Sequence, residues 1–178
     1  MSEPLSLPDY VELTKPPRDS LHARALEASR VAHMVNCLPQ FIEDPALPIV
    51  VRQACVETFF THVRSLIEFL EIREAKQPNK DDFFAKSIVP DWKPVIDNDL
   101  RTKLNKCWKE ASKHVAHLSK KRATTWTDET EASLQLIADD VLTVWDQYAE
   151  AAAPNLFARR RSDLHPFWAS EYPTTGTT

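Results

Sequence analysis

The sequence predicts an all-α protein, an antiparallel bundle of four main helices, and two observations lead to that prediction. The chain of 178 residues contains a single glycine, Gly176, close to its end. Tight β-hairpins need positive φ angles, which glycine adopts at the least cost. Apolar residues instead recur every three or four positions along several long stretches, which is the period of an α-helix. Nucleotide-binding glycine loops are excluded for the same lack of glycine.

Prolines divide the chain into an arm, a bundle and a tail. Residues 1–18 hold four prolines and are expected to form an extended N-terminal arm. Residues 19–153 contain the periodic stretches and form the helical bundle domain. Residues 154–178 are expected to be an irregular C-terminal tail. A length of 178 residues suits one domain with a substantial core.

Four helices are expected within the bundle domain. The first begins at an N-cap, Asp19–Ser20, and runs to Pro39. The second runs from about Ile49 to Ala75, with Pro48 in its first turn. After an irregular stretch whose aromatic residues, among them Trp92, are expected to pack on the bundle, the third covers about 97–121. The fourth starts at a cap formed by Thr125 or Thr127 and stops at Pro154. Short connections between such helices favour alternating directions.

Cysteine usage and hydropathy predict a cytoplasmic protein without a metal or another cofactor. The three cysteines, Cys37, Cys55 and Cys107, are far apart and show no C-x-x-C spacing. Each lies among apolar neighbours, where free cysteine behaves as a small hydrophobic residue. The N-terminus resembles no secretory signal. No segment reaches about 18 consecutive apolar residues, so no membrane span is expected.

The most unusual stretch runs from Arg101 to Arg122. It contains eight lysines and arginines and one acid, Glu110, which is a formal charge of +7. Because the whole chain has a charge of −4, the remainder carries −11. This asymmetry indicates an anionic partner, either RNA or an acidic protein. The alternative is a solvated basic face whose cations suit the C-terminal end of the helix dipole.

Two faces follow from the helical period in this stretch. The apolar positions from Leu104 to Leu118 are expected to face the core, while Lys106, Lys113 and Lys121 share another face with His117. His114 lies three residues before His117. Imidazole groups exchange protons near neutral pH while lysines hold phosphate, so the pattern suits phosphate chemistry.

Two further arrangements of ionisable side chains occur in the predicted helices. Glu110, His114 and His117 have the spacing of three zinc ligands, but the surrounding lysines repel a dication and the H-E-x-x-H motif is absent. In the second helix, Arg64 and Glu68 form an i, i+4 pair within a broad apolar face. We expect Arg64 either to extend to solvent or to point into a polar pocket between helices.

Together these two segments resemble the HEPN superfamily, and more narrowly a bacterial branch related to abortive-infection proteins. The resemblance rests on His62-x-Arg64-x-Leu66-Ile67-x-Phe69-Leu70 in the second helix. In the third it rests on Asn105-Lys106 and on Lys113-His114-Val115-Ala116-His117-Leu118-Ser119-x-x-Arg122. It implies a helical bundle that forms a homodimer. In many members an arginine separated from a histidine by four to six intervening residues forms a metal-independent ribonuclease site.

On this sequence the resemblance assigns His117 as the family histidine. The arginine does not carry over, because the window before His117 holds Glu110, Ala111 and Ser112. Arg64, from the neighbouring helix, is the residue that could supply the guanidinium. The predicted catalytic residues are therefore His117 and Arg64. The predicted RNA- or phosphate-binding residues are Lys106, Lys113, His114, Lys121 and Arg122.

Two functions remain open on the sequence. The first is an RNA-interacting protein of a defence or toxin–antitoxin system, which cleaves RNA without a metal ion. The second is a non-catalytic, dimerising interaction protein whose basic face docks an acidic partner.

Overall fold

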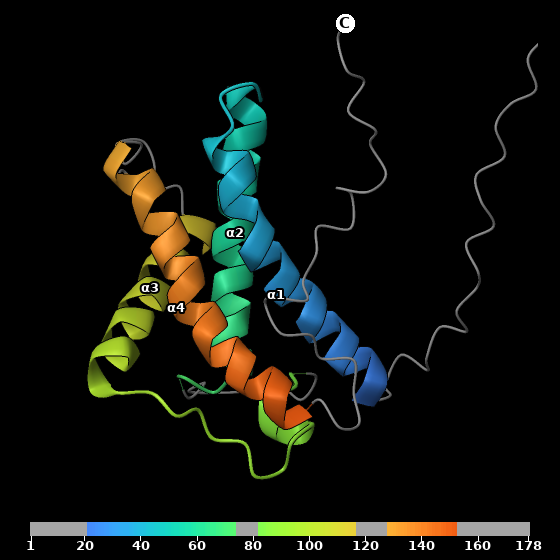
Figure 1. Cartoon of the computed structure of the whole chain (residues 1–178). Helices are drawn as coiled ribbons and strands as arrows, with labels where there is room; N and C mark the ends of the chain where they lie inside the picture. The colour runs from blue at the N-terminus through green and yellow to red at the C-terminus, as the bar shows by residue number, and fades with distance from the viewer. Residues whose placement is uncertain (1–20, 74–81, 117–127, 153–178) are drawn as a thin grey trace, which may run out of the picture.

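The computed structural model describes residues 21–73, 82–116 and 128–152, and within them the protein is an all-helical bundle (Figure 1). The main helices are α1 (Leu21–Glu43), α2 (Ile49–Phe69), α3 (Asn98–Ala116) and α4 (Asp128–Ala152). Successive helices run in opposite directions, and each packs against its neighbours in a closed ring, α4 returning to α1. A short 3₁₀ helix, η1 (Ala85–Ser87), precedes α3. The predicted fold class is confirmed. None of the described helices is both long and apolar enough to cross a bilayer.

The core forms where the helical apolar faces meet. On α2, every residue that the period assigns to the interior is buried, among them Phe59, Val63 and Leu66. On α4, Trp145 and Tyr148 are fully buried and lie 5.1 Å apart between ring centroids. Phe69 meets Tyr148 edge to face at 5.0 Å. Edge-to-face aromatic pairs of this kind add about 0.5 to 1.5 kcal/mol beyond their buried area.

Helix α1 extends past the proline at which the sequence predicts its end. Pro39 lies inside the helix, which continues to Glu43. Proline lacks one backbone N–H and disfavours the helical conformation of the residue before it. Here Pro39 is buried, as are Leu38 and Ile42 on either side of it. Burial of these residues against the bundle outweighs the lost hydrogen bond, so α1 gains one further turn.

Helix α2, by contrast, ends at Phe69, six residues before the predicted end. Glu71 adopts a left-handed conformation with φ of 56°. The N–H of Glu71 donates to the carbonyl of Glu68 and that of Ile72 to the carbonyl of Ile67, which is a Schellman motif. Ile72 is buried, so the motif folds the chain back onto the bundle.

The aromatic residues of the segment before α3 pack on the bundle, as predicted. Trp92 is buried, and its indole N–H donates to the carbonyl of Leu70 at 3.0 Å. Phe83 meets Phe69 at 5.8 Å between ring centroids. Asp97 then caps α3, because its side chain accepts from the N–H of Leu100 at 2.7 Å.

Candidate anion-binding site between α2 and α3

The predicted i, i+4 pair on α2 points toward α3. Arg64 Nε lies 3.3 Å from Glu68 Oε1, and the same oxygen accepts from Trp108 Nε1 on α3 at 2.8 Å. The guanidinium carbon of Arg64 lies 5.2 Å from the centre of the Trp108 ring. Arg64 therefore contacts the neighbouring helix, and its side chain remains 37% exposed. Cation–π contacts of this kind contribute about 0.5 to 1 kcal/mol where the groups are exposed.

A second arginine covers the same indole. The guanidinium carbon of Arg73 lies 3.6 Å from the centre of the Trp108 ring. In addition, Arg101 of α3 donates to the carbonyl of Ile72 at 2.8 Å and so attaches this part of the chain to α3. Together we call Arg64, Glu68, Arg73, Arg101 and Trp108 the α2–α3 cluster. It holds three arginines and one acid around one partly exposed indole.

The Schellman turn explains how both arginines reach one ring. Residues of an α-helix advance by about 100° each, so a helix continued to Ala75 would place Arg73 about 180° away from Arg64. The reversal at Glu71 instead returns Arg73 to the side of α3. Sequence reasoning missed Arg73 for this reason, since the usual signal for such a turn is glycine and position 71 is a glutamate.

Away from the Trp108 indole, α3 presents a row of three lysines, which the helical period places about 100° (Lys109) to about 160° (Lys106) around the helix from Trp108. Lys103, Lys106 and Lys109 are all exposed, and none forms an ion pair with another described residue. Helix α4, packed next to α3, contains seven acids and no lysine or arginine. Glu110 of α3 and Asp140 of α4 place negative charge close to Cys107. Together with burial, which is the larger cause, they raise the pKa of that thiol to about 12. The described lysines nevertheless face solvent.

The predicted site residues are distributed as follows. Arg64 lies in the cluster and Lys106 in the lysine row. Lys113 and His114 belong to α3, although the structure does not describe their side chains. His117, Lys121 and Arg122 lie outside the described residues. His114 follows Trp108 by six residues, which is about 9 Å along a helix axis.

Two histidines whose side chains the structure describes lie elsewhere, on α1 and α2. His33 is buried on α1 with Cys37 Sγ at 3.7 Å from its Nε2 atom, and burial lowers the pKa of its imidazole. His62 is half-buried, and burial, then Arg30, lowers its pKa. Within residues 21–73, 82–116 and 128–152, no three histidine, cysteine, aspartate or glutamate side chains gather closely enough to hold a metal ion.

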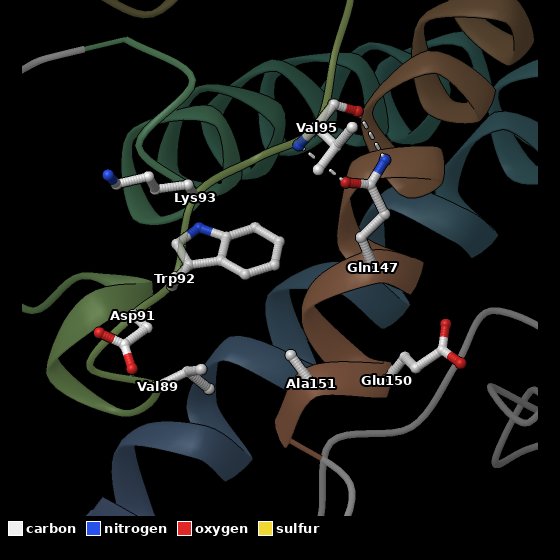
Figure 2. Close-up of a pocket in the computed structure, with 8 residues that line it drawn as sticks. All are labelled: Val89, Asp91, Trp92, Lys93, Val95, Gln147, Glu150 and Ala151. Atoms are coloured by element: carbon white, nitrogen blue, oxygen red, sulfur yellow. Dashed lines mark hydrogen bonds between the residues drawn. The ribbon is translucent and has the colours of Figure 1, made fainter.

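A pocket of about 520 Å³ lies at the other edge of the bundle, between the segment before α3 and the end of α4 (Figure 2). Within it, the Gln147 amide forms two 3.0 Å hydrogen bonds with the backbone of Val95. Figure 2 shows Asp91 and Lys93 extending on the side away from α4, while Glu150 lies on α4 itself. These charged groups do not converge, so the α2–α3 cluster is the better candidate for a binding site.

Comparison of the chain with protein-family models, with curated proteins and with solved structures finds no match. The candidate functional groups among the described residues are those of the α2–α3 cluster and of the lysine row.

Proposed function

We propose that this protein binds RNA along α3, through the α2–α3 cluster and the lysine row. The observation that supports the proposal most directly is the pair of arginines, Arg64 and Arg73, over one partly exposed indole. Single strands are bound by grooves that combine cationic groups with aromatic rings. Guanidinium groups suit phosphate because their N–H donors match two oxygens at once. The three exposed lysines extend the positive charge along the same helix.

The proposed chemistry is metal-independent cleavage, in keeping with the HEPN resemblance. His117 would accept the proton of the RNA 2′-OH, whose oxygen attacks the adjacent phosphorus. The P–O5′ bond then breaks, the leaving 5′-oxygen takes up a proton, and cations would stabilise the phosphate in the transition state. His114, Lys113, Lys121 and Arg122 surround His117 in sequence. Arg64 contacts Trp108, which lies about 9 Å along the α3 axis from His114. That separation suits Arg64 to holding a neighbouring nucleotide rather than the reacting phosphate.

Binding is tested by its dependence on salt. The affinity for single-stranded RNA should fall with salt concentration, with a logarithmic slope of about −0.7 for each phosphate that is neutralised. Replacing Lys103, Lys106 and Lys109 together by glutamine should lower that slope by about 2. Lys93→Gln is the control, because this exposed lysine lies at the pocket and outside the lysine row. The proposal is contradicted if the protein does not bind RNA, or if the triple substitution leaves its RNA affinity unchanged.

Cleavage is tested separately, by RNA turnover in the presence of EDTA with wild type and His117→Ala. Loss of turnover in the folded variant alone supports a metal-independent ribonuclease. Binding without turnover in either protein leaves an RNA-binding module. If neither binding nor turnover occurs, the basic face becomes a docking surface for an acidic protein partner.

A further inference from the structure

The indole of Trp108 is fixed by a hydrogen bond at its N–H, and one face of the ring is covered by a guanidinium that can move away. Glu68 accepts from Nε1 at 2.8 Å, which sets the orientation of the ring. The guanidinium of Arg73 lies over the ring at 3.6 Å, the separation of two planar groups in van der Waals contact. The indole is partly exposed rather than part of the core. A planar group of similar thickness could therefore occupy the place of the guanidinium without any change in the ring.

Among the three arginines of the cluster, Arg73 is the one least restrained within the described residues. Arg64 is paired with Glu68, and Arg101 donates to the carbonyl of Ile72. Arg73 has no ion pair or hydrogen bond to another described residue, so its contact with the indole is its only interaction there. Moving its guanidinium off the ring breaks no polar contact in this part of the chain.

We propose that Trp108 is a stacking site for one unpaired nucleobase, which displaces the guanidinium of Arg73 from the indole. The released guanidinium then pairs with the phosphate next to that base, while Arg64 remains with Glu68. This inference rests on the proposed function and narrows it to single-stranded RNA. Bases in a duplex already stack on one another and cannot reach the ring. Stacking on an aromatic ring tolerates any base, because every base has a π face.

The test compares two RNA probes that carry the same charge. One is an oligouridylate of about ten nucleotides, within the usual site sizes, and the other is an abasic phosphoribose strand of the same length. Electrostatic attraction is equal for both, so the ratio of their affinities isolates the contribution of the bases. We expect wild type to bind the intact strand on the order of tenfold more tightly.

Three variants test whether Trp108 and Arg73 cause the difference in affinity between the intact and the abasic strand. Trp108→Leu should bring the affinity ratio close to one, while Trp108→Phe, which retains a ring, should keep most of it. Arg73→Gln should lower the salt slope of the intact strand by about 0.7 and leave that of the abasic strand nearly unchanged, because only a stacked base releases this guanidinium to a phosphate. Thermal unfolding of each variant establishes that it is folded.

The outcomes separate this inference from the proposed function. Absence of binding to both probes contradicts the proposed function itself. Equal binding of intact and abasic strands by wild type, or a ratio that persists in Trp108→Leu, overturns only the stacking site. The wild-type comparison requires no variant, so it decides the question even if Trp108→Leu is unstable. Tighter binding of an RNA duplex than of the single strand would also overturn the inference.

Discussion

Glu68 is the single acid of the α2–α3 cluster, and its replacement separates the stability of the cluster from its charge. In Glu68→Gln the amide oxygen can still accept from the Trp108 indole, while the ion pair with Arg64 is lost. The two side chains of that pair are 37% and 32% exposed, for Arg64 and Glu68 respectively. Solvent screens a pair of this kind, so its loss should lower the free energy of unfolding by less than about 1 kcal/mol.

Glu68→Ala also removes the acceptor of the indole N–H. A hydrogen bond to a charged group contributes about 1.5 to 3 kcal/mol when buried, and less at a half-exposed position. We therefore expect the alanine variant to lose about 1 to 2 kcal/mol, which is more than the glutamine variant loses. Urea unfolding of the three proteins in one buffer measures the difference. Equal stability of the two variants would show that the 2.8 Å contact does not stabilise the fold.

The affinity for RNA should change in the opposite direction. Both substitutions remove a negative charge from among three arginines. Two unit charges about 6 Å apart interact by about 0.7 kcal/mol in water and by more at a protein surface. The affinity for single-stranded RNA at low salt should therefore rise by about threefold or more.

The matched control is Glu43→Gln, which changes the net charge equally at an exposed residue of α1. Glu43 precedes the start of α2, and Glu68 lies about 28 Å further along that helix. Because Coulomb attraction weakens with distance, Glu43→Gln should raise the affinity for RNA much less than Glu68→Gln does. If Glu68→Gln binds RNA no better than Glu43→Gln while both are folded, the α2–α3 cluster is not the contact surface.

Two further predictions concern the core. Burial raises the pKa of Cys107 to about 12 from an ordinary value of 9.0, so the stability associated with its neutral form is complete below that ordinary value. As the pH rises from there toward 12, this stability should decline by about 1.4 kcal/mol per pH unit, and Cys107→Ala should flatten the decline in urea unfolding between about pH 8 and 10. The Tyr148 hydroxyl is buried and has no hydrogen-bond partner among the described residues. Tyr148→Phe should therefore be neutral or raise the melting temperature, and a loss above about 1 kcal/mol would reveal a partner.

Much of the fold could be predicted because its cause is local. The apolar positions of α2 and α4 recur with the helical period, and residues such as Phe59, Val63 and Trp145 are buried as that period requires. The packing of Trp92 on the bundle is also as predicted. Helix ends were predicted less well, because Pro39 lies within α1 and Glu71 ends α2 against their usual tendencies.

The candidate site, like the fold, could be predicted from the sequence only in part. The sequence by itself determined that α3 carries excess positive charge, since charge and helical period are both properties of the local chain. It also indicated the pair of Arg64 with Glu68, because residues four apart on a helix are neighbours. Only the tertiary structure decided that Glu68 also binds the indole of Trp108 and that Arg73 covers its face. Those contacts join residues distant in sequence, and the contact of Arg73 also depends on the left-handed turn at Glu71.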